Sequence, residues 1–380
     1  MYTIGLDLGT TNTVAAANAG VLPLHFGDQV VPVLPSVVAY LPNGEVMVGL
    51  PARERRAFDV KNTIFSAKRV LGETWHSYSA REFRTHYPFD LVATANDEVG
   101  FRTRAGVVTP VDVAAEIARA LSRHAGLSPQ EISACVSVPA SFGVPQRAAT
   151  VSALRHAGFA AVRCIAEPVA TALAYLDRND VHYGCVYDLG GGTFDLAIVD
   201  CSREPVRVVT HGGDPYLGGD DLDQRIAHWA AEVVLRKHGW DLQSDREVFT
   251  RLTLEAERAK VRLTKNQVTT LDLEGVDPAA PADLQPIQLD RKAVWNLSAE
   301  LISRTFAICD EVLGSASLTV RDIQAVFLAG GATLVPGVRE AVAEYFGKKL
   351  RYELDPMHVV SIGASIAAAR PRLSALLSDQ

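Results

Sequence analysis

The sequence Cys185-Val-Tyr-Asp-Leu-Gly-Gly-Gly-Thr-Phe-Asp-Leu-Ala-Ile-Val199 joins two apolar runs through an acid, three glycines and a threonine. A shorter copy opens the chain, where Asp7-Leu-Gly-Thr-Thr11 lies between apolar runs at residues 2–8 and 12–17. Each copy predicts a strand, a tight turn and a second strand. Because the copies lie about 180 residues apart, the sequence predicts two duplicated α/β lobes with mixed sheets around a central cleft.

Both turns have the composition of phosphate-binding loops. Their glycines let backbone N–H groups approach an anion, and each turn adds a hydroxyl group. One copy alone fits an ordinary turn equally well. Two copies with the same acid-Leu-Gly spacing favour a polyphosphate held between opposed loops. The nucleotide-binding residues that we expect here are Gly9, Thr10, Thr11, Asn12, Gly190, Gly191, Gly192 and Thr193.

Composition and charge narrow the class of protein. The chain has 380 residues, of which 48% are hydrophobic, so it can bury a large core. Its 37 basic and 44 acidic residues give a formal net charge of −7, and Lys and Arg form no basic run. We therefore expect no nucleic-acid partner.

Cysteine spacing and the amino terminus indicate the compartment. The five cysteines include no Cys-x-x-Cys pair, so neither a zinc site nor a disulfide framework is indicated. The amino terminus does not resemble a signal peptide, and no apolar run reaches the roughly 18 residues of a membrane-spanning helix. We expect a cytoplasmic protein that does not enter a membrane.

Neither turn is a Walker loop or a dinucleotide fingerprint, because no Gly-Lys-Ser/Thr and no Gly-x-Gly-x-x-Gly occurs there. Further motifs carry a more specific resemblance. They are Gly5-Leu-Asp-Leu-Gly-Thr-Thr-Asn12, Phe65-Ser-Ala-Lys-Arg-Val-Leu-Gly72, Val138-Pro-Ala-Ser-Phe142, Glu167-Pro168, Leu217-Gly-Gly-Asp-Asp-Leu-Asp223 and Gly330-Gly331. From residue 3 to about residue 368, their order and spacing resemble the nucleotide-binding domain of the DnaK-type seventy-kilodalton heat-shock chaperones.

The resemblance implies an actin-like ATPase fold, also called ribonuclease H-like. It places one lobe at residues 1–180, with a small subdomain inserted at about 36–107. The second lobe would span 181–380, with a small subdomain at about 219–300. Complete family members add an apolar linker and a peptide-gripping β-sandwich, which this sequence lacks. We expect either a piece of a longer chaperone or a solitary ATPase, without a peptide-binding domain.

The resemblance also assigns the catalytic centre. Asp7 and Asp188 would hold hydrated Mg²⁺ through its waters, and Lys68 would reach the γ-phosphate and the attacking water. Carboxylates beside a polyphosphate repel it unless cations lie between them, so the residues themselves imply Mg²⁺. K⁺ is implied by the resemblance alone. The expected catalytic residues are Lys68, Glu167, Asp188, Thr193 and Asp195, and the expected metal-binding residues are Asp7 and Asp188.

A predicted helix carries the expected adenosine-binding face. A capping box at Ser244 and Glu247 predicts that this helix starts there and runs to about Lys265. The resemblance assigns one polar face to ribose and base, whereas a solvated face with an ion pair is the alternative interpretation. The expected residues of this side are Glu257, Lys260 and Thr264, with Gly218, Gly219, Asp220, Gly330, Gly331, Ala332 and Leu334 from neighbouring loops.

Three positions depart from the family around the base. Many relatives have the motif Gly-Gly-Ser-Thr-Arg at residues 330–334, so Ala332 replaces a serine and Leu334 replaces an arginine. Some relatives have a cationic residue at the position of Val261. A stacking cation contributes about 0.5–2 kcal/mol, and each 1.4 kcal/mol is about tenfold in affinity. We therefore expect weaker or less base-selective nucleotide binding. Met357 stands where relatives often have an acid.

The resemblance implies partners as well. Pro139 and Arg147 match residues that couple the nucleotide state to the interdomain linker, and Arg163 matches the docking site of a J-domain co-chaperone. A nucleotide-exchange factor is a further expected partner of a monomeric protein. As plain sequence, these positions also fit a strand-end proline and two surface arginines.

Several functions remain open at this point. The first is a slow, Mg²⁺-dependent ATPase that acts as the switch of a stress-response chaperone. The second is a small-molecule kinase, such as a sugar kinase, on the same fold. The third is a filament-forming actin relative or a nucleotide sensor without turnover.

Overall fold

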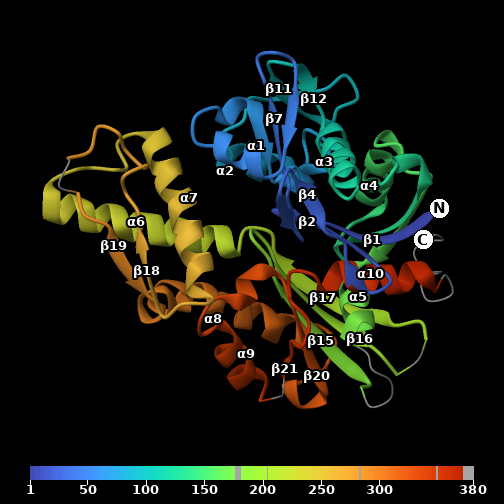
Figure 1. Ribbon diagram of the computed structural model, residues 1–380. Coiled ribbons are helices and arrows are strands. Elements are labelled where there is room, and N and C mark those ends of the chain that lie inside the picture. Colours follow the sequence, from blue (N-terminus) through green and yellow to red (C-terminus); the bar gives the residue numbers. More distant parts are fainter. Residues whose placement is uncertain (176–180, 203, 282–283, 348–349, 371–380) are drawn as a thin grey trace.

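The chain folds around two mixed β-sheets. A computed structural model describes residues 1–175, 181–202, 204–281, 284–347 and 350–370 (Figure 1). The first sheet has the strand order β14-β13-β1-β2-β3, and a short strand, β6, pairs with β2. Its strands are β1 (Tyr2–Leu8), β2 (Asn12–Ala17), β3 (Gly20–Val21), β6 (Leu34–Pro35), β13 (Ile132–Val138) and β14 (Ala161–Ala166). The two strands predicted at 2–8 and 12–17 are confirmed.

The second sheet repeats this topology in the order β21-β20-β15-β16-β17. Its central strand β15 pairs antiparallel with β16 and parallel with β20, just as β1 pairs with β2 and β13. The mixed α/β class is confirmed, and the shared strand order is what a duplication produces. The strands are β15 (Tyr183–Leu189), β16 (Phe194–Asp200), β17 (Arg207–Asp214), β20 (Ala325–Ala329) and β21 (Leu350–Arg351).

We call residues 1–175 the N-terminal half and residues 181–370 the C-terminal half. In the N-terminal half, helices and small sheets follow the first sheet: β4 (Leu24–Phe26), β5 (Gln29–Val31), β7 (Val37–Tyr40), β8 (Val46–Val48), α1 (Leu50–Arg55), β9 (Thr63–Phe65), α2 (Tyr78–His86), β10 (Leu91–Ala93), β11 (Val99–Thr103), β12 (Gly106–Val108), α3 (Pro110–His124), α4 (Val144–His156) and α5 (Glu167–Tyr175). The C-terminal half adds α6 (Gly219–His238), α7 (Arg246–Leu263), β18 (Val268–Leu271), β19 (Ile287–Asp290), α8 (Arg291–Ser315), α9 (Val338–Phe346) and α10 (Val359–Ala369). Figure 1 shows α6, α7, β18 and β19 extending from the second sheet on the side where α1 and α2 lie.

Helix ends follow local capping chemistry, with one correction. Thr109 caps α3 in a capping box, and α6 ends at Gly239 with a left-handed φ of 66°. The predicted cap at Ser244 is wrong. The carboxylate of Asp245 caps α7 by accepting from the N–H groups of Glu247 and Val248, because an acid one position later reaches both.

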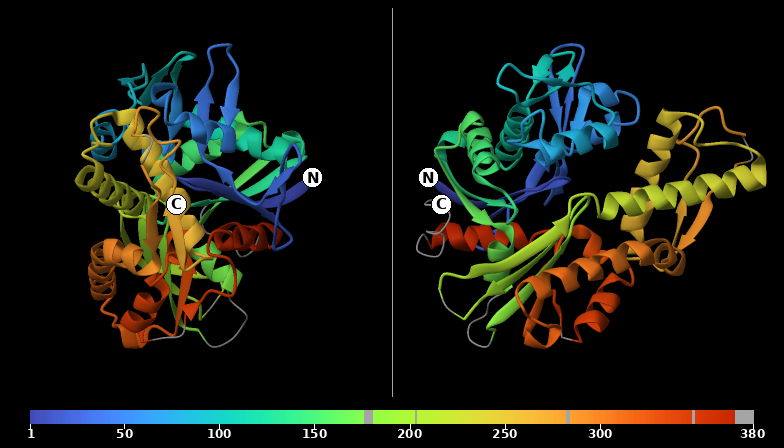
Figure 2. Two further views of the ribbon diagram at one scale, coloured as in Figure 1. Left: turned by 60° about the vertical axis from the view of Figure 1, so that its left-hand side comes forward. Right: turned by 180° about the vertical axis from the view of Figure 1, so that it is seen from behind.

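Two helices rich in small residues form a layer between the sheets. Figure 2 (right) shows α10, in red, between the blue strands of the first sheet and the green strands of the second. A Cβ atom on Gly5 of β1 would overlap the backbone of α10 at Ser365, and one on Gly363 of α10 would overlap the carbonyl group of Ala170 in α5. The helices therefore approach each other and β1 at backbone distance, which only glycine permits.

Other expectations concern membranes and cysteines. No helix within the described ranges is both long and apolar enough to cross a bilayer. All five cysteines are free thiols, and three of them are buried. Residues 371–380, on which the expectation about an interdomain linker bears, lie outside the described residues.

We predict that Gly363→Ala destabilises the protein by about 1–3 kcal/mol or more, because the added methyl group overlaps the Ala170 carbonyl group. Thermal and urea unfolding measure the change. The matched control is Gly314→Ala in α8, where the new Cβ atom meets no other group. That control should be neutral or stabilising by up to about 1 kcal/mol. Equal stabilities of the two variants would contradict the close packing.

Candidate functional site

A cleft of about 540 Å³ opens between the halves. The first turn lines it with Gly9–Asn12, and the second turn lines it with Gly190, Gly191 and Thr193. The two turns touch, since a Cβ atom on Gly191 would overlap the side chain of Thr11. Segments far apart in the sequence therefore form facing walls of one cavity.

Acidic side chains and a lysine line the cleft between the turns. They are Asp7, Lys68, Glu167, Asp188 and Asp195. Asp7 and Asp188 hold equivalent places near the ends of β1 and β15, and Asp188 pairs with Asp195 in the β15–β16 register. Lys68 Nζ donates a hydrogen bond to Glu167 Oε1 at 2.7 Å. Within this cluster, four carboxylates therefore surround one ammonium group, that of Lys68.

Burial and crowding shift the pKa values of this cluster. Burial, followed by repulsion from Glu167, raises the pKa of Asp7 to about 6 and that of Asp195 to about 7. The same causes raise the pKa of Asp188 well above its ordinary value. Burial acts to lower the pKa of Lys68, but attraction by Glu167 and Asp7 outweighs it and raises that pKa. The cluster therefore has excess negative charge that a cation would relieve.

The cleft has the donor groups that a hydrated hard cation and a phosphate need. Asp7 and Asp188 offer carboxylate oxygens, which Mg²⁺ prefers. No group of three acidic, His or Cys side chains in the described ranges is close enough to enclose a bare ion. Thr11 Oγ1 is buried without a hydrogen-bond partner, as expected of a hydroxyl group that serves a ligand. These observations fit a water-mediated metal site beside a phosphate chain.

Comparison with known proteins identifies the family. A family model described as Hsp70 protein matches residues 3–371. The chain belongs to the Hsp70 family. Chaperone protein HscA homologs from Methylobacillus flagellatus and Ralstonia pickettii are each 38% identical over 370 residues. The match covers 96% of this chain and 57% of each relative, so the chain spans little more than half the length of these Hsp70-family relatives. The two mixed sheets are consistent with the actin-like ATPase lobes of Hsp70 proteins.

In this Hsp70 chain, one wall of the cleft is formed by two glycines and three apolar side chains. It consists of Gly330, Gly331, Pro356, Met357 and Val360. Gly330 has a left-handed φ of 82°, and a Cβ atom there would overlap the carbonyl group of Leu189. A Cβ atom on Gly331 would lie 3.3 Å from Met357 Cγ, so the thioether side chain packs against this loop.

Several expected nucleotide-binding residues do not line the cleft. They are Gly192, Gly218, Gly219, Asp220, Glu257, Lys260, Thr264, Ala332 and Leu334. Gly219 and Asp220 lie behind the second turn, where their N–H groups donate to its carbonyl oxygens. Ala332 packs in the core of the C-terminal half, and Thr264 Oγ1 donates to Val261 O within its own helix region. Nucleotide contacts of these residues stay predictions.

Lys260 has protein partners rather than an open face. Its Nζ donates to Asp223 Oδ2 at 2.7 Å and to Gly219 O at 2.9 Å. Asp223 is only 3% exposed, and burial raises its pKa to about 7 although Lys260 opposes the shift. This buried ion pair joins α6 to α7 inside the Hsp70 chain.

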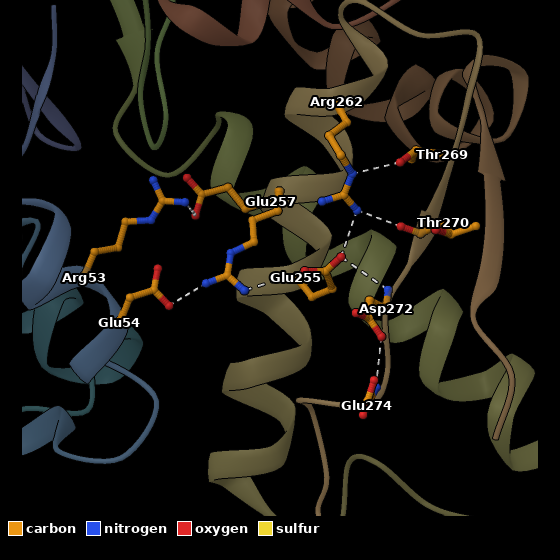
Figure 3. A network of polar contacts seen from close by, with 10 residues as sticks. Arg53, Glu54, Glu255, Glu257, Arg262, Thr269, Thr270, Asp272 and Glu274 are labelled. Carbon is orange, nitrogen blue, oxygen red and sulfur yellow. Dashed lines mark hydrogen bonds and ion pairs between the residues drawn. The ribbon is translucent and has the colours of Figure 1, made fainter. Parts of the chain in front are cut away.

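Ion pairs also connect the two halves through α1 and α7 (Figure 3). Arg53 Nη2 lies 3.6 Å from Glu257 Oε2, and the guanidinium group of Arg258 donates to Glu54. The four side chains are 21–54% exposed, so each pair contributes about 0.2–1 kcal/mol. On the other side of α7, buried Glu255 accepts from Arg262 at 2.8 Å.

Sequence reasoning missed several residues of the cleft wall. They include Arg69, Glu73, Gln146, His211 and Tyr216. Gln146 Nε2 donates to Glu73 Oε1 at 2.8 Å, which joins the start of α4 to the loop after Lys68. For three of them the only signal in the sequence is their place in or beside a quoted motif: Arg69 follows Lys68, Glu73 follows Gly72, and Tyr216 precedes Leu217.

We predict that Lys260→Met lowers the free energy of unfolding by about 3–5 kcal/mol, because Asp223 is left as an unpaired buried charge. Urea unfolding without nucleotide measures the loss. Adding Asp223→Asn to the same chain should restore part of the stability, because it removes the buried charge. A single variant as stable as the wild type would show that the ion pair is not structural.

Proposed function

We propose that this chain is the ATP-binding and slowly ATP-hydrolysing switch of an Hsp70 chaperone. One observation carries the proposal: two glycine turns from halves of like topology meet across a cleft where Asp7, Glu167, Asp188 and Asp195 lie around Lys68. Membership of the Hsp70 family supports ATP as the nucleotide.

The cleft residues fall into two groups: charged side chains, and neutral hydroxyl and N–H groups that can bind phosphate. Asp7 and Asp188 would hold Mg²⁺ through its water shell, and the bound ion neutralises phosphate charge during transfer. Lys68 brings its ammonium group to the terminal phosphate. Thr11 and Thr193 offer hydroxyl groups, and the glycines offer N–H groups. Phosphoryl transfer needs chiefly this charge neutralisation and a well-placed nucleophile.

The attacking water would be ordered by Glu167 and Asp195. A strong general base needs a carboxylate that is free to accept a proton. Glu167 already accepts a hydrogen bond from Lys68 at 2.7 Å, so this carboxylate oxygen is engaged with the ammonium group. We propose slow turnover, which suits a switch whose two nucleotide states must persist.

Lobe closure would transmit the nucleotide state. In this proposal lobes at 1–180 and 181–380, with small subdomains at about 36–107 and 219–300, close on ATP and relax on ADP. The similarity to chaperone HscA homologs supports co-chaperone partners in general. As the specific partners we propose a J-domain co-chaperone and a nucleotide-exchange factor. K⁺ would accompany Mg²⁺ in the cleft.

We predict that Lys68→Ala lowers single-turnover ATP hydrolysis by about 100-fold or more, because a preorganised donor to developing charge is lost. ATP affinity should change much less. Chelation of Mg²⁺ with EDTA should also abolish turnover in the wild type.

The matched control is Lys61→Ala, which removes an exposed lysine outside the cleft and should leave hydrolysis unchanged. Hydrolysis by Lys68→Ala at the wild-type rate would contradict the proposed mechanism. Nucleotide binding without turnover in the wild type would favour a sensor, and turnover that requires a sugar would favour a kinase.

We place the base against the wall at Pro356, Met357 and Val360, and we predict weak base selection there. A site that hydrogen-bonds its ligand can reject analogues by about 10⁴-fold or more, whereas an apolar pocket discriminates far less. Calorimetric dissociation constants for ATP and GTP should therefore differ by less than about tenfold. Strict adenine selectivity would show that other groups compensate for Ala332 and Leu334.

A further inference from the structure

The carbonyl oxygens of the second turn all have hydrogen-bond donors. We use the name second turn for Gly190–Thr193. Its first three carbonyl oxygens accept from separate groups: Gly190 from the N–H of Gly219 at 3.0 Å, Gly191 from the N–H of Asp220 at 2.5 Å, and Gly192 from Arg69 Nη2 at 2.7 Å. The first two donors belong to the start of α6 in the same half. The third donor comes from the other half of the molecule.

These bonds determine where the N–H groups of the turn point. In a trans peptide, the carbonyl group of one residue and the N–H group of the next point in opposite directions. The N–H groups of Gly191, Gly192 and Thr193 are therefore directed away from the donors behind the turn. Within the described ranges, none of the three donates to another protein group. They are available for an anion in the cleft.

The first turn is held differently. Its carbonyl oxygens at Gly9 and Thr11 accept from Ser36 Oγ and Ser36 N, each at 2.8 Å. Ser36 belongs to the same half and also bonds to Thr13 at 2.9 Å. These two carbonyl oxygens of the first turn therefore accept from a residue of their own half, whereas the second turn depends on Arg69 from the opposite half.

Arg69 is placed for this role rather than for an ion pair. It lies in the short helix η2 (Ala67–Val70), beside Lys68, and no carboxylate in the described residues lies within 4.0 Å of its guanidinium group. The guanidinium carbon lies 4.9 Å from the ring centre of Tyr216, in the C-terminal half. A Cβ atom on Gly192 would overlap Arg69 Nη2, so a glycine is needed for the contact.

We propose that Arg69 is a positioning residue that completes the second phosphate-binding turn only when the two halves are closed. Its bond to the Gly192 carbonyl group fixes the following peptide, and so it aims the N–H group of Thr193 at the phosphate chain. Opening of the halves withdraws Arg69 and loosens the turn. The inference rests on the proposed function for the identity of the anion.

Variants of Arg69 test this role by nucleotide affinity. We expect Arg69→Met to raise the dissociation constant for ATP by roughly tenfold, the loss of about one hydrogen bond to a charged group. Adenosine, which lacks phosphate, should bind as in the wild type. Arg69→Lys should recover part of the ATP affinity, since an ammonium group can still donate to Gly192 O.

Hydrogen exchange tests the turn without nucleotide. The N–H group of Gly190 donates to Thr193 O at 2.9 Å across the turn, so its exchange reports whether the turn is closed. We expect faster exchange in Arg69→Met than in the wild type. The matched control is Arg84→Met: Arg84 also donates to a carbonyl oxygen, that of Trp75 at 2.9 Å, and stacks on a ring, but within one half.

The outcomes separate the inference from the proposed function. Arg69→Met with wild-type ATP affinity and wild-type exchange at 189–194 would overturn the positioning role. Equal losses for ATP and adenosine, or equal effects of Arg84→Met, would also overturn it, because they indicate general loosening of the fold. If the wild type binds no ATP, the proposed function fails, while the exchange comparison still decides the role of Arg69.

Discussion

The close contact of α10 with β1 and α5 determines the position of everything in the cleft. Gly5 and Gly363 bring three backbones together, and the same helical layer packs on the second sheet through Val186 and Phe327. Both sheets are thereby fixed to one layer, so the turns that follow β1 and β15 meet. Because α5 begins at Glu167, the layer also carries an acid of the site.

Two buried clusters of charged side chains differ in their charge balance: one is a paired ion pair within the fold, and the other has excess negative charge and lines the cleft. The pair of Asp223 and Lys260 has matched charges, short bonds and no open face to the cleft, which is the pattern of a stabilised ion pair. The cluster around Lys68 is unbalanced, and its acids have raised pKa values because burial and mutual repulsion oppose their charge. Such imbalance costs stability and is retained where a ligand supplies the missing charge.

The sequence predicted the mixed sheets and the paired strands, because these follow from local patterns of glycine and apolar residues repeated in each half. The acids that meet in the cleft were expected from the family resemblance. It did not predict the partners of Lys260 or the role of Arg69. A lysine on a helix face can reach a ligand or an acid such as Asp223, and only the packing of α6 against α7 decides between them. Arg69 meets Gly192 across the cleft, 123 residues away, with no pattern linking them. The cap of α7 was likewise not predicted correctly, because the sequence does not tell which of two adjacent residues, Ser244 or Asp245, points at the free N–H groups of the helix.

The ion pairs between α1 and α7 lie far from the layer of α5 and α10 about which the halves are joined (Figure 1). For rotation about such an axis, displacement grows with radius, so a few degrees of opening separates Arg258 from Glu54 much more than it separates the two turns. In the proposed closure, weak, solvent-screened charges at that radius would act on the opening of the halves with a long lever arm. Ionic strength would then tune how long the molecule stays shut without altering a single group that touches the phosphates.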